Sequence, residues 1–214
     1  MVHDFYSDGT CGYLPRYYDS RFQAIAVKVL PGQHYVTDRP DEMLVTVLGS
    51  CVAACIRDPV AAVGGMNHFM LPESVSGDWG GEAASLRFGN HAMAQLIADI
   101  LWHNGRLDRL EVKLFGGSAV TGTRGANASA ARASVGGRVG SDNAAFALRF
   151  LHDAGLKVVA QNLGGTAPRA IKFFPVSGRV LMRQLTEGKA ERDGFKELAA
   201  EPKKERVWAR KSES

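Results

Sequence analysis

One continuous stretch, residues 43–68, reads MLVTVLGSCVAACIRDPVAAVGGMNH and organises the rest of this chain of 214 residues. Its first part, Met43 to Leu48, is a β-branched apolar run that predicts a strand. The dipeptide Asp58-Pro59 predicts a type I turn, because Asp suits the first position of that turn and Pro the second. If residues 58–61 form this turn, the register of the flanking strands places Cys51 directly opposite His68.

Cys51 and His68 would then project from the same face of a hairpin, with Cβ atoms about 4.5 to 5.5 Å apart. A free thiol is only a few per cent thiolate at neutral pH, and a neighbouring imidazole raises that fraction. The N–H groups of Gly49 and Ser50, with that of Cys51, are placed to face a developing oxyanion. The pattern therefore predicts acyl transfer at an amide or ester carbonyl through a thioester.

Cysteine also has a second interpretation, because free cysteine is among the residue types most often buried for packing alone. Cys55 is on the same face, opposite Gly64 in the predicted register, and is interpreted as a core residue. Cys11 has no partner that the sequence reveals. Cys51-x-x-x-Cys55 with His68 lacks the second close pair of a zinc site, so neither a metal nor another cofactor is expected.

The amino-acid composition excludes several classes of protein. A hydrophobic content of 45% and a charged content of 22% are those of an ordinary soluble globular protein. The net charge of +4 is not gathered in one segment, which argues against a nucleic-acid partner. The odd number of cysteines and an N-terminus without signal-peptide features predict the reducing cytoplasm. The longest apolar run, Val47 to Ile56, is far shorter than the roughly 20 residues that span a bilayer, so no membrane insertion is expected.

Three segments are predicted along the chain. All five tyrosines lie in the first 35 residues, and we interpret residues 1–22 as an aromatic extension that docks on the main body. Residues 23–186 form the domain. Residues 187–214 form a tail rich in charges of both signs, in which Lys196 to Arg206 is the expected helical piece.

Strand and helix patterns alternate within the domain. A strand is predicted over Leu110 to Leu114, and the final hairpin over Ile171 to Phe174 and Arg179 to Arg183. One helix is expected from Asn90 to Asn104 and another from Ser141 to Gly155, followed by a strand from Leu156 to Ala160. Glu73 to Gly89 and Gly116 to Gly140 lack periodicity and are expected to be long loops.

Several motifs together resemble the CheD family of chemoreceptor glutamine deamidases. They are Leu48-Gly49-Ser50-Cys51-Val52, Arg57-Asp58-Pro59, Gly64-Gly65-x-x-His68-x-x-Leu71-Pro72, Phe115-Gly116-Gly117-Ser118, Gly140-x-x-Asn143 and Gly164-Gly165-x-x-Pro168-Arg169. The resemblance covers about residues 24–185. It implies an α/β fold of the α+β type, in which a β-sandwich-like core is flanked by helices in a single domain.

The resemblance also implies an activity and partners. The implied reaction is hydrolysis of selected glutamine side chains to glutamates on methyl-accepting chemotaxis receptors. Hydrolysis of receptor methyl esters and binding of a CheC-type phosphatase are implied as further properties. The loop that holds Gly116, Gly117 and Ser118 is expected to contribute to substrate binding.

The family's site is a Cys, His and Thr triad, which carries over to Cys51 and His68. Family members can have the threonine six residues before the cysteine, where this chain has Val45. The neighbouring Thr46 is therefore assigned the role of orienting His68, although a one-residue shift reverses the face of a regular strand. Its alternative interpretation is a β-branched residue that serves strand formation alone.

Two rival functions remain open on the sequence. A cleft with Cys51 and His68 can bind receptors or a CheC-like partner as an adaptor without turnover. An unrelated cysteine hydrolase could act on small amides and would then hydrolyse free glutamine. Modification of a receptor glutamine, which mass spectrometry detects, separates the deamidase from both.

Overall fold

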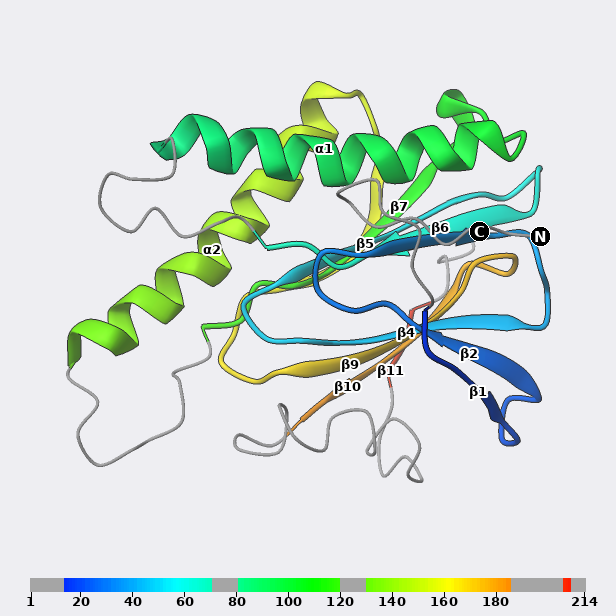
Figure 1. Cartoon of the computed structure of the whole chain (residues 1–214), viewed down its shortest axis with the longest axis horizontal. Coiled ribbons are helices and arrows are strands. Elements are labelled where there is room, and N and C mark those ends of the chain that lie inside the picture. The colour runs from blue at the N-terminus through cyan, green and yellow to red at the C-terminus, as the bar shows by residue number, and fades with distance from the viewer. Residues whose placement is uncertain (1–13, 71–80, 120–129, 186–205, 209–214) are drawn as a thin grey trace, which may run out of the picture.

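A computed structural model describes residues 14–70, 81–119, 130–185 and 206–208 (Figure 1). Ten of its strands precede residue 186: β1 (Arg16–Asp19), β2 (Ala24–Lys28), β3 (His34–Thr37), β4 (Glu42–Leu48), β5 (Val52–Asp58), β6 (Val63–Asn67), β7 (Glu111–Gly116), β8 (Val158–Leu163), β9 (Arg169–Phe174) and β10 (Arg179–Gln184). The remaining elements are β11 (Arg206–Trp208), the helices α1 (Gly81–Trp102) and α2 (Ala130–Asp153), and the 3₁₀ turn η1 (Leu107–Arg109).

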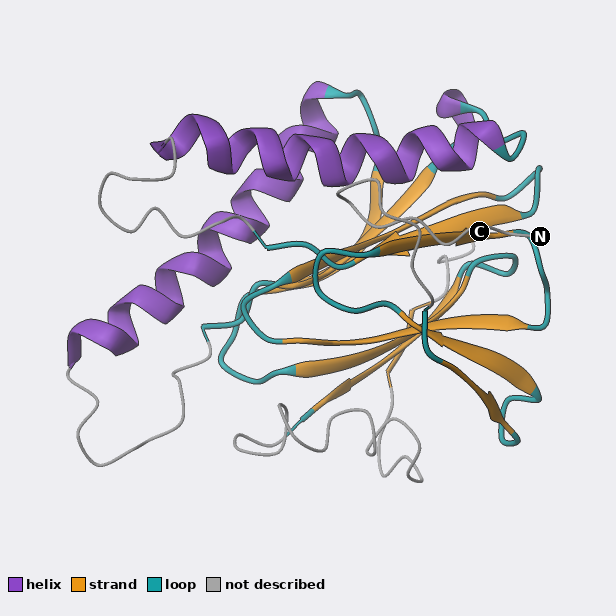
Figure 2. Cartoon of the chain, viewed as in Figure 1, coloured by secondary structure: helices purple, strands orange, loops and turns teal. Residues whose placement is uncertain are grey.

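The elements form three layers (Figure 2). One sheet has the strand order β1-β2-β4-β9-β10-β11 and the other β3-β6-β5-β7-β8. A cluster of buried side chains from both sheets fills the space between them, and a second cluster joins the five-stranded sheet to α1 and α2. The predicted α+β fold, with a sandwich-like core flanked by helices in a single domain, is confirmed; both helices cover the same sheet.

Strand β4 explains why residues 43–48 read as a continuous apolar run. Leu44 and Leu48 belong to the core between the sheets, whereas Met43 and Val45 pack on the outer face of the six-stranded sheet. A strand buried on both faces has no polar side to alternate with. The next strand, β5, belongs to the other sheet, so residues 49–51 carry the chain from one layer to the other.

The predicted register of the β5–β6 hairpin is wrong by two residues. Val52 bridges Phe69 and Cys55 pairs with Met66, so Cys51 is not opposite His68 and Cys55 is not opposite Gly64. The cause is a longer turn, because Asp58 pairs with Val63 instead of closing on residue 61. A slip of two residues preserves the face of every side chain, which leaves Cys51 and His68 on the same side of the strands.

Both helices begin earlier than predicted, α1 at Gly81 instead of Asn90 and α2 at Ala130 instead of Ser141. The Ser141 hydroxyl donates to the Arg138 carbonyl inside α2 and does not cap it (2.8 Å). Residues 130–140 hold three alanines and three glycines, and each glycine disfavours helix by about 1 kcal/mol relative to alanine, so helix propensity alone does not explain the early start of α2. The two expected loops are correspondingly shorter, and their remaining parts, 71–80 and 120–129, lie outside the described residues.

The predicted strands of the domain are present, but their ends are shifted. The strand predicted over Leu156 to Ala160, for example, is β8 over Val158–Leu163. Two apolar helix residues, Leu101 in α1 and Leu148 in α2, are each 38% exposed. None of the helices in the described part is long and apolar enough to cross a bilayer.

The ends of the described chain join the six-stranded sheet. Part of the predicted extension forms β1, which pairs with β2. Arg206 begins β11, which pairs with β10, so it does not end the predicted helix. The rest of that helix, the other tail residues and Cys11 lie outside the described residues, and the division at residues 22 and 186 stays a prediction.

Candidate active site

Three connections meet at one end of the sandwich, on the left in Figure 1: the β4–β5 crossing, the turn after β7 and the β8–β9 loop. The Ser118 N–H donates to the Gly49 carbonyl and the Gly117 N–H to the Cys51 carbonyl, both at 2.8 Å. The Gly164 N–H donates to the Gly116 carbonyl at 3.0 Å. Cys51 therefore stands on a backbone segment that is bonded to the turn after β7, which is bonded in turn to the β8–β9 loop.

Thr46 and His68 come together between the sheets. The Oγ1 atom of Thr46 lies 2.8 Å from Nδ1 of His68, and the Thr46 hydroxyl donates to the Val29 carbonyl at 2.7 Å. A hydroxyl has one hydrogen to donate, so Thr46 accepts its bond from His68. This arrangement places the proton of the neutral imidazole on Nδ1 and leaves Nε2 with a free lone pair.

The imidazole of His68 is only 3% exposed, and its Nε2 atom has no hydrogen-bond partner among the described residues. Burial disfavours the charged ring and lowers the pKa of His68 to about 4. The ring is therefore neutral near neutral pH, in the form that accepts a proton.

Cys51 is half-buried and packs at the margin of the core between the sheets. Burial raises the pKa of its thiol, so the neutral thiol predominates near neutral pH. No hydrogen bond joins Cys51 to His68 within the described part, although both face the space between the sheets. Bonds between catalytic groups are often long in a free enzyme and shorten only when substrate is bound.

The backbone just before Cys51 is held through its carbonyl oxygens. The Gly49 and Ser50 carbonyls accept hydrogen bonds from the Ser118 N–H and from Nδ2 of Asn143, both at 2.8 Å. The N–H groups of Ser50 and Cys51 make no hydrogen bond to another residue in the part of the chain that the structure describes, and the Cys51 N–H lies within reach of its own sulfur. N–H groups left open beside a thiol are donors available to a negatively charged oxygen.

The turn after β7 packs against this segment through Gly116, Gly117 and Ser118. A Cβ atom on Gly116 would lie 2.1 Å from the Cys51 carbonyl oxygen, and both glycines have positive φ angles (118° and 67°). Ser118 is fully buried; its hydroxyl donates to the Ala167 carbonyl (2.9 Å) and accepts from Arg169 (2.7 Å). Ser118 has no exposed surface and supports the loop, whose contribution to substrate binding stays a prediction.

Sequence reasoning missed the roles of Asn143 and Arg169. The buried Arg169 guanidinium bonds the Asn162 and Gly164 carbonyls and the Asn162 side chain, the last at 2.6 Å, and so joins the β8–β9 loop to Ser118. Burial lowers the pKa of Arg169 from its usual value. Both residues stand in motifs that carry the family resemblance, Gly140-x-x-Asn143 and Pro168-Arg169, which was the only signal for them.

Comparisons with known proteins show to which family the chain belongs. The family model described as CheD chemotactic sensory transduction matches residues 70–184, a range that begins just after His68. A protein of Rhodopseudomonas palustris (strain BisA53) named "Probable chemoreceptor glutamine deamidase CheD" is 50% identical over 193 residues, which cover 87% of this chain and 85% of that protein. A protein of the same name from Saccharophagus degradans is 48% identical over 174 residues, 79% of this chain and 75% of that one.

Among solved structures, Neisseria meningitidis protein NMB0706 overlaps 63% of this chain and 54% of its own at 13% identity, with a TM-score of 0.37. So distant an overlap bears on neither the site nor its chemistry. The match of the family model to more than half of the chain and the identity of about half to relatives over most of their length both point one way. This chain belongs to the CheD family.

Proposed function

We propose that the protein is a glutamine deamidase that converts selected glutamine side chains of chemoreceptors to glutamates, with Cys51 as the nucleophile. The observation that carries the proposal is the buried Nε2 atom of His68, which the bond to Thr46 leaves unprotonated, on a residue that lies on the same side of the strands as Cys51. The names of the relatives from Rhodopseudomonas palustris and Saccharophagus degradans supply the class of substrate.

The reaction begins when Nε2 of His68 takes the proton of the Cys51 thiol. The sulfur then bonds to the side-chain amide carbon of glutamine, and an electron pair of the carbonyl moves to its oxygen. When that pair returns, the carbon–nitrogen bond breaks, and the nitrogen leaves as ammonia with the proton from His68.

A thioester with Cys51 remains. His68 deprotonates a water molecule that attacks this thioester, and the collapse of the second tetrahedral intermediate releases a glutamate side chain and restores the thiol. The sum is one water consumed and one ammonia released. A receptor methyl ester would follow the same path with methanol as the leaving group, so we infer that the same site can accept it.

Deamidation of a purified chemoreceptor fragment tests the proposal. Ammonia release and peptide mass spectrometry are measured for the wild-type protein and three variants. Cys51→Ala should abolish both signals, and His68→Ala should lower the rate by about 100-fold to 10,000-fold, the usual range for a general base. Cys55→Ala is the matched control and should retain activity, because Cys55 is a buried core residue inside β5.

Wild-type activity in the Cys51→Ala protein would disprove the role of the nucleophile. Binding of the receptor fragment without any change in its mass would favour the adaptor. Ammonia released from free glutamine but not from the receptor would favour a hydrolase of small amides.

A further inference from the structure

The peptide group that joins Ser50 to Cys51 is held by α2. Nδ2 of Asn143 donates to the Ser50 carbonyl oxygen at 2.8 Å. Because a peptide group is planar and trans, the N–H of Cys51 points away from that carbonyl. The bond from Asn143 therefore fixes the direction of a group that it does not touch.

The next peptide group, between Cys51 and Val52, has the same geometry, but both its C=O and its N–H are hydrogen-bonded. The Cys51 carbonyl accepts from the Gly117 N–H at 2.8 Å, while the Val52 N–H donates in the opposite direction to the Phe69 carbonyl at 2.9 Å. The Cys51 N–H has no such acceptor among the described residues. N–H groups in such positions nearly always have an acceptor. The Cys51 N–H is therefore a donor that a group bound beside the thiol can use.

The position of Asn143 is itself fixed by close packing of α2 on the turn after β7. A Cβ atom on Gly140 would lie 2.5 Å from the Ser118 carbonyl oxygen, so only glycine allows the helix to approach this closely. Asn143 lies one turn further along α2 and is 1% exposed. Its amide is thus held on a rigid helix and not on a loop.

We propose that Asn143 is a positioning residue that aims the Cys51 N–H at the oxygen of the tetrahedral intermediate. As the Cys51 sulfur bonds to the carbonyl carbon, the electron pair that moves to the oxygen creates a negative charge, and the Cys51 N–H donates to it. The inference rests on the proposed acyl transfer at Cys51. A donor held in place before the reaction needs no reorientation when the charge forms.

Two reagents for the same thiol separate this role from general support. p-Nitrophenyl acetate acylates a thiol through an oxyanion, whereas iodoacetamide alkylates it by displacement of iodide with no oxyanion. The rates of both reactions at Cys51 are measured by mass spectrometry, together with the kcat and KM of receptor deamidation, for wild type, Asn143→Ala and Asn143→Asp. Leu151→Val is the matched control, because Leu151 is fully buried in α2 two turns beyond Asn143.

Loss of the aimed donor should slow acylation and lower kcat on the order of 10-fold to 100-fold in Asn143→Ala. Asn143→Asp should lose at least as much, because a carboxylate repels the Ser50 carbonyl. Alkylation of Cys51 should stay within about twofold of wild type, and KM should change little. The Leu151→Val protein should react like wild type with both reagents.

Equal losses of acylation and alkylation in the Asn143 variants would overturn the inference, because they would mean that Asn143 only supports the Cys51 segment. Unchanged acylation and kcat would overturn it as well. Failure of the proposed function gives a different result: wild-type Cys51 would still be acylated, and Asn143→Ala would still slow it, while no receptor glutamine changed.

Discussion

Thr46 determines which nitrogen of His68 carries the proton. Alternation along β4 points Thr46 into the space between the sheets beside Leu44 and Leu48, and it points Val45 to the outer face. Only Thr46 can therefore reach the imidazole, at 2.8 Å from Nδ1. The face of the strand, and not the count of residues before Cys51, decides which position can serve the histidine.

Thr46→Val tests this effect with a side chain of nearly the same shape. Without the hydroxyl, His68 loses the acceptor that orients its Nδ1–H, and kcat should fall by about 10-fold to 100-fold. Nitrogen NMR of the imidazole should show a less uniform Nδ1–H tautomer. Thr37→Val is the control, because Thr37 is also buried but bonds the Arg39 N–H instead (3.1 Å). An unchanged kcat in Thr46→Val would show that Thr46 serves strand formation alone.

Single residues show where sequence reasoning succeeds and where it stops. Cys51 and His68 could be selected because thiol and imidazole carry recognisable chemistry in a short window, whereas Thr46 was selected only through the family resemblance. Asn143 could not be selected, because its amide acts on a backbone carbonyl 93 positions away in the chain. Such a contact depends on how closely α2 approaches the sheet, which no local pattern encodes.

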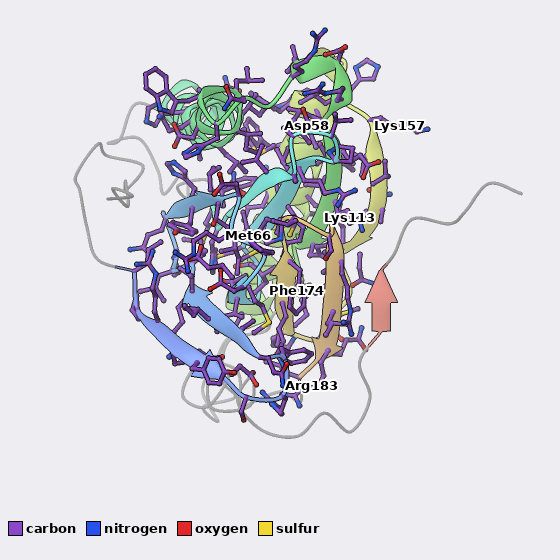
Figure 3. The ribbon with its side chains drawn as sticks, turned by 90° about the vertical axis from the view of Figure 1, so that its right-hand side faces the viewer. Asp58, Met66, Lys113, Lys157, Phe174 and Arg183 are labelled. Carbon is purple, nitrogen blue, oxygen red and sulfur yellow. The ribbon has the colours of Figure 1, made fainter. Side chains whose placement is uncertain are left out.

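At the scale of elements, Asp58 ties the β5–β6 hairpin to the segment after α1 (Figure 3). Its carboxylate accepts from the N–H groups of Val60, Ala61 and Arg106, and from the Arg109 side chain at 2.6 Å. Burial alone would raise the pKa of Asp58, but these hydrogen bonds outweigh it and lower the pKa to about 2. One side chain thus fixes both the turn and its neighbour.

Asp58→Asn should lower the free energy of unfolding by about 2 to 4 kcal/mol, because it removes a buried charge and leaves Arg109 without its partner. Urea unfolding measures the change. The control is Asp108→Asn, whose ion pair with Arg106 is exposed on both sides (65% each) and should contribute far less to stability. Equal effects of the two substitutions would show that burial of Asp58 adds nothing.

The ends of the elements reveal a second limit of sequence reasoning. The strands β4, β9 and β10 were predictable because apolar and β-branched runs mark them, and turn residues bound the hairpin. The register of β5 and β6 was not, since the side chain of Asp58 lengthens their turn. Nor was the start of α2, because Gly140 reads as a loop residue although the helix requires it for close contact with Ser118.

For the whole molecule, the stacking of two sheets places an ionisable ring in a dry interior. The pKa of His68 falls from 6.5 to about 4 because the folded protein disfavours its charged form. The unfolded chain therefore binds more protons than the folded one between these values, and stability rises with pH across this window. The stability linked to His68 is complete above pH 6.5 and is lost as the pH falls toward about 4.

Unfolding by urea across this pH range should thus show a loss of about 3 kcal/mol that depends on His68. In a His68→Gln variant, whose side chain does not titrate, the loss over the same range should be smaller by that amount. The Asp58 carboxylate loses its stabilising effect as the pH falls from 3.8 to about 2, so it acts below this range and is common to both proteins. If the free energy of unfolding depended on pH equally in the wild type and in His68→Gln, burial would not be lowering the pKa of His68.

The crossing of the chain between layers at residues 49–51 has a consequence for the newly made protein. Thr46 comes from one sheet, His68 follows a strand of the other, and Cys51 lies on the segment between them. Neither sheet alone brings Thr46, His68 and Cys51 together. Under the proposed mechanism, a chain with only one layer formed could not modify glutamine side chains, and activity would require the complete sandwich.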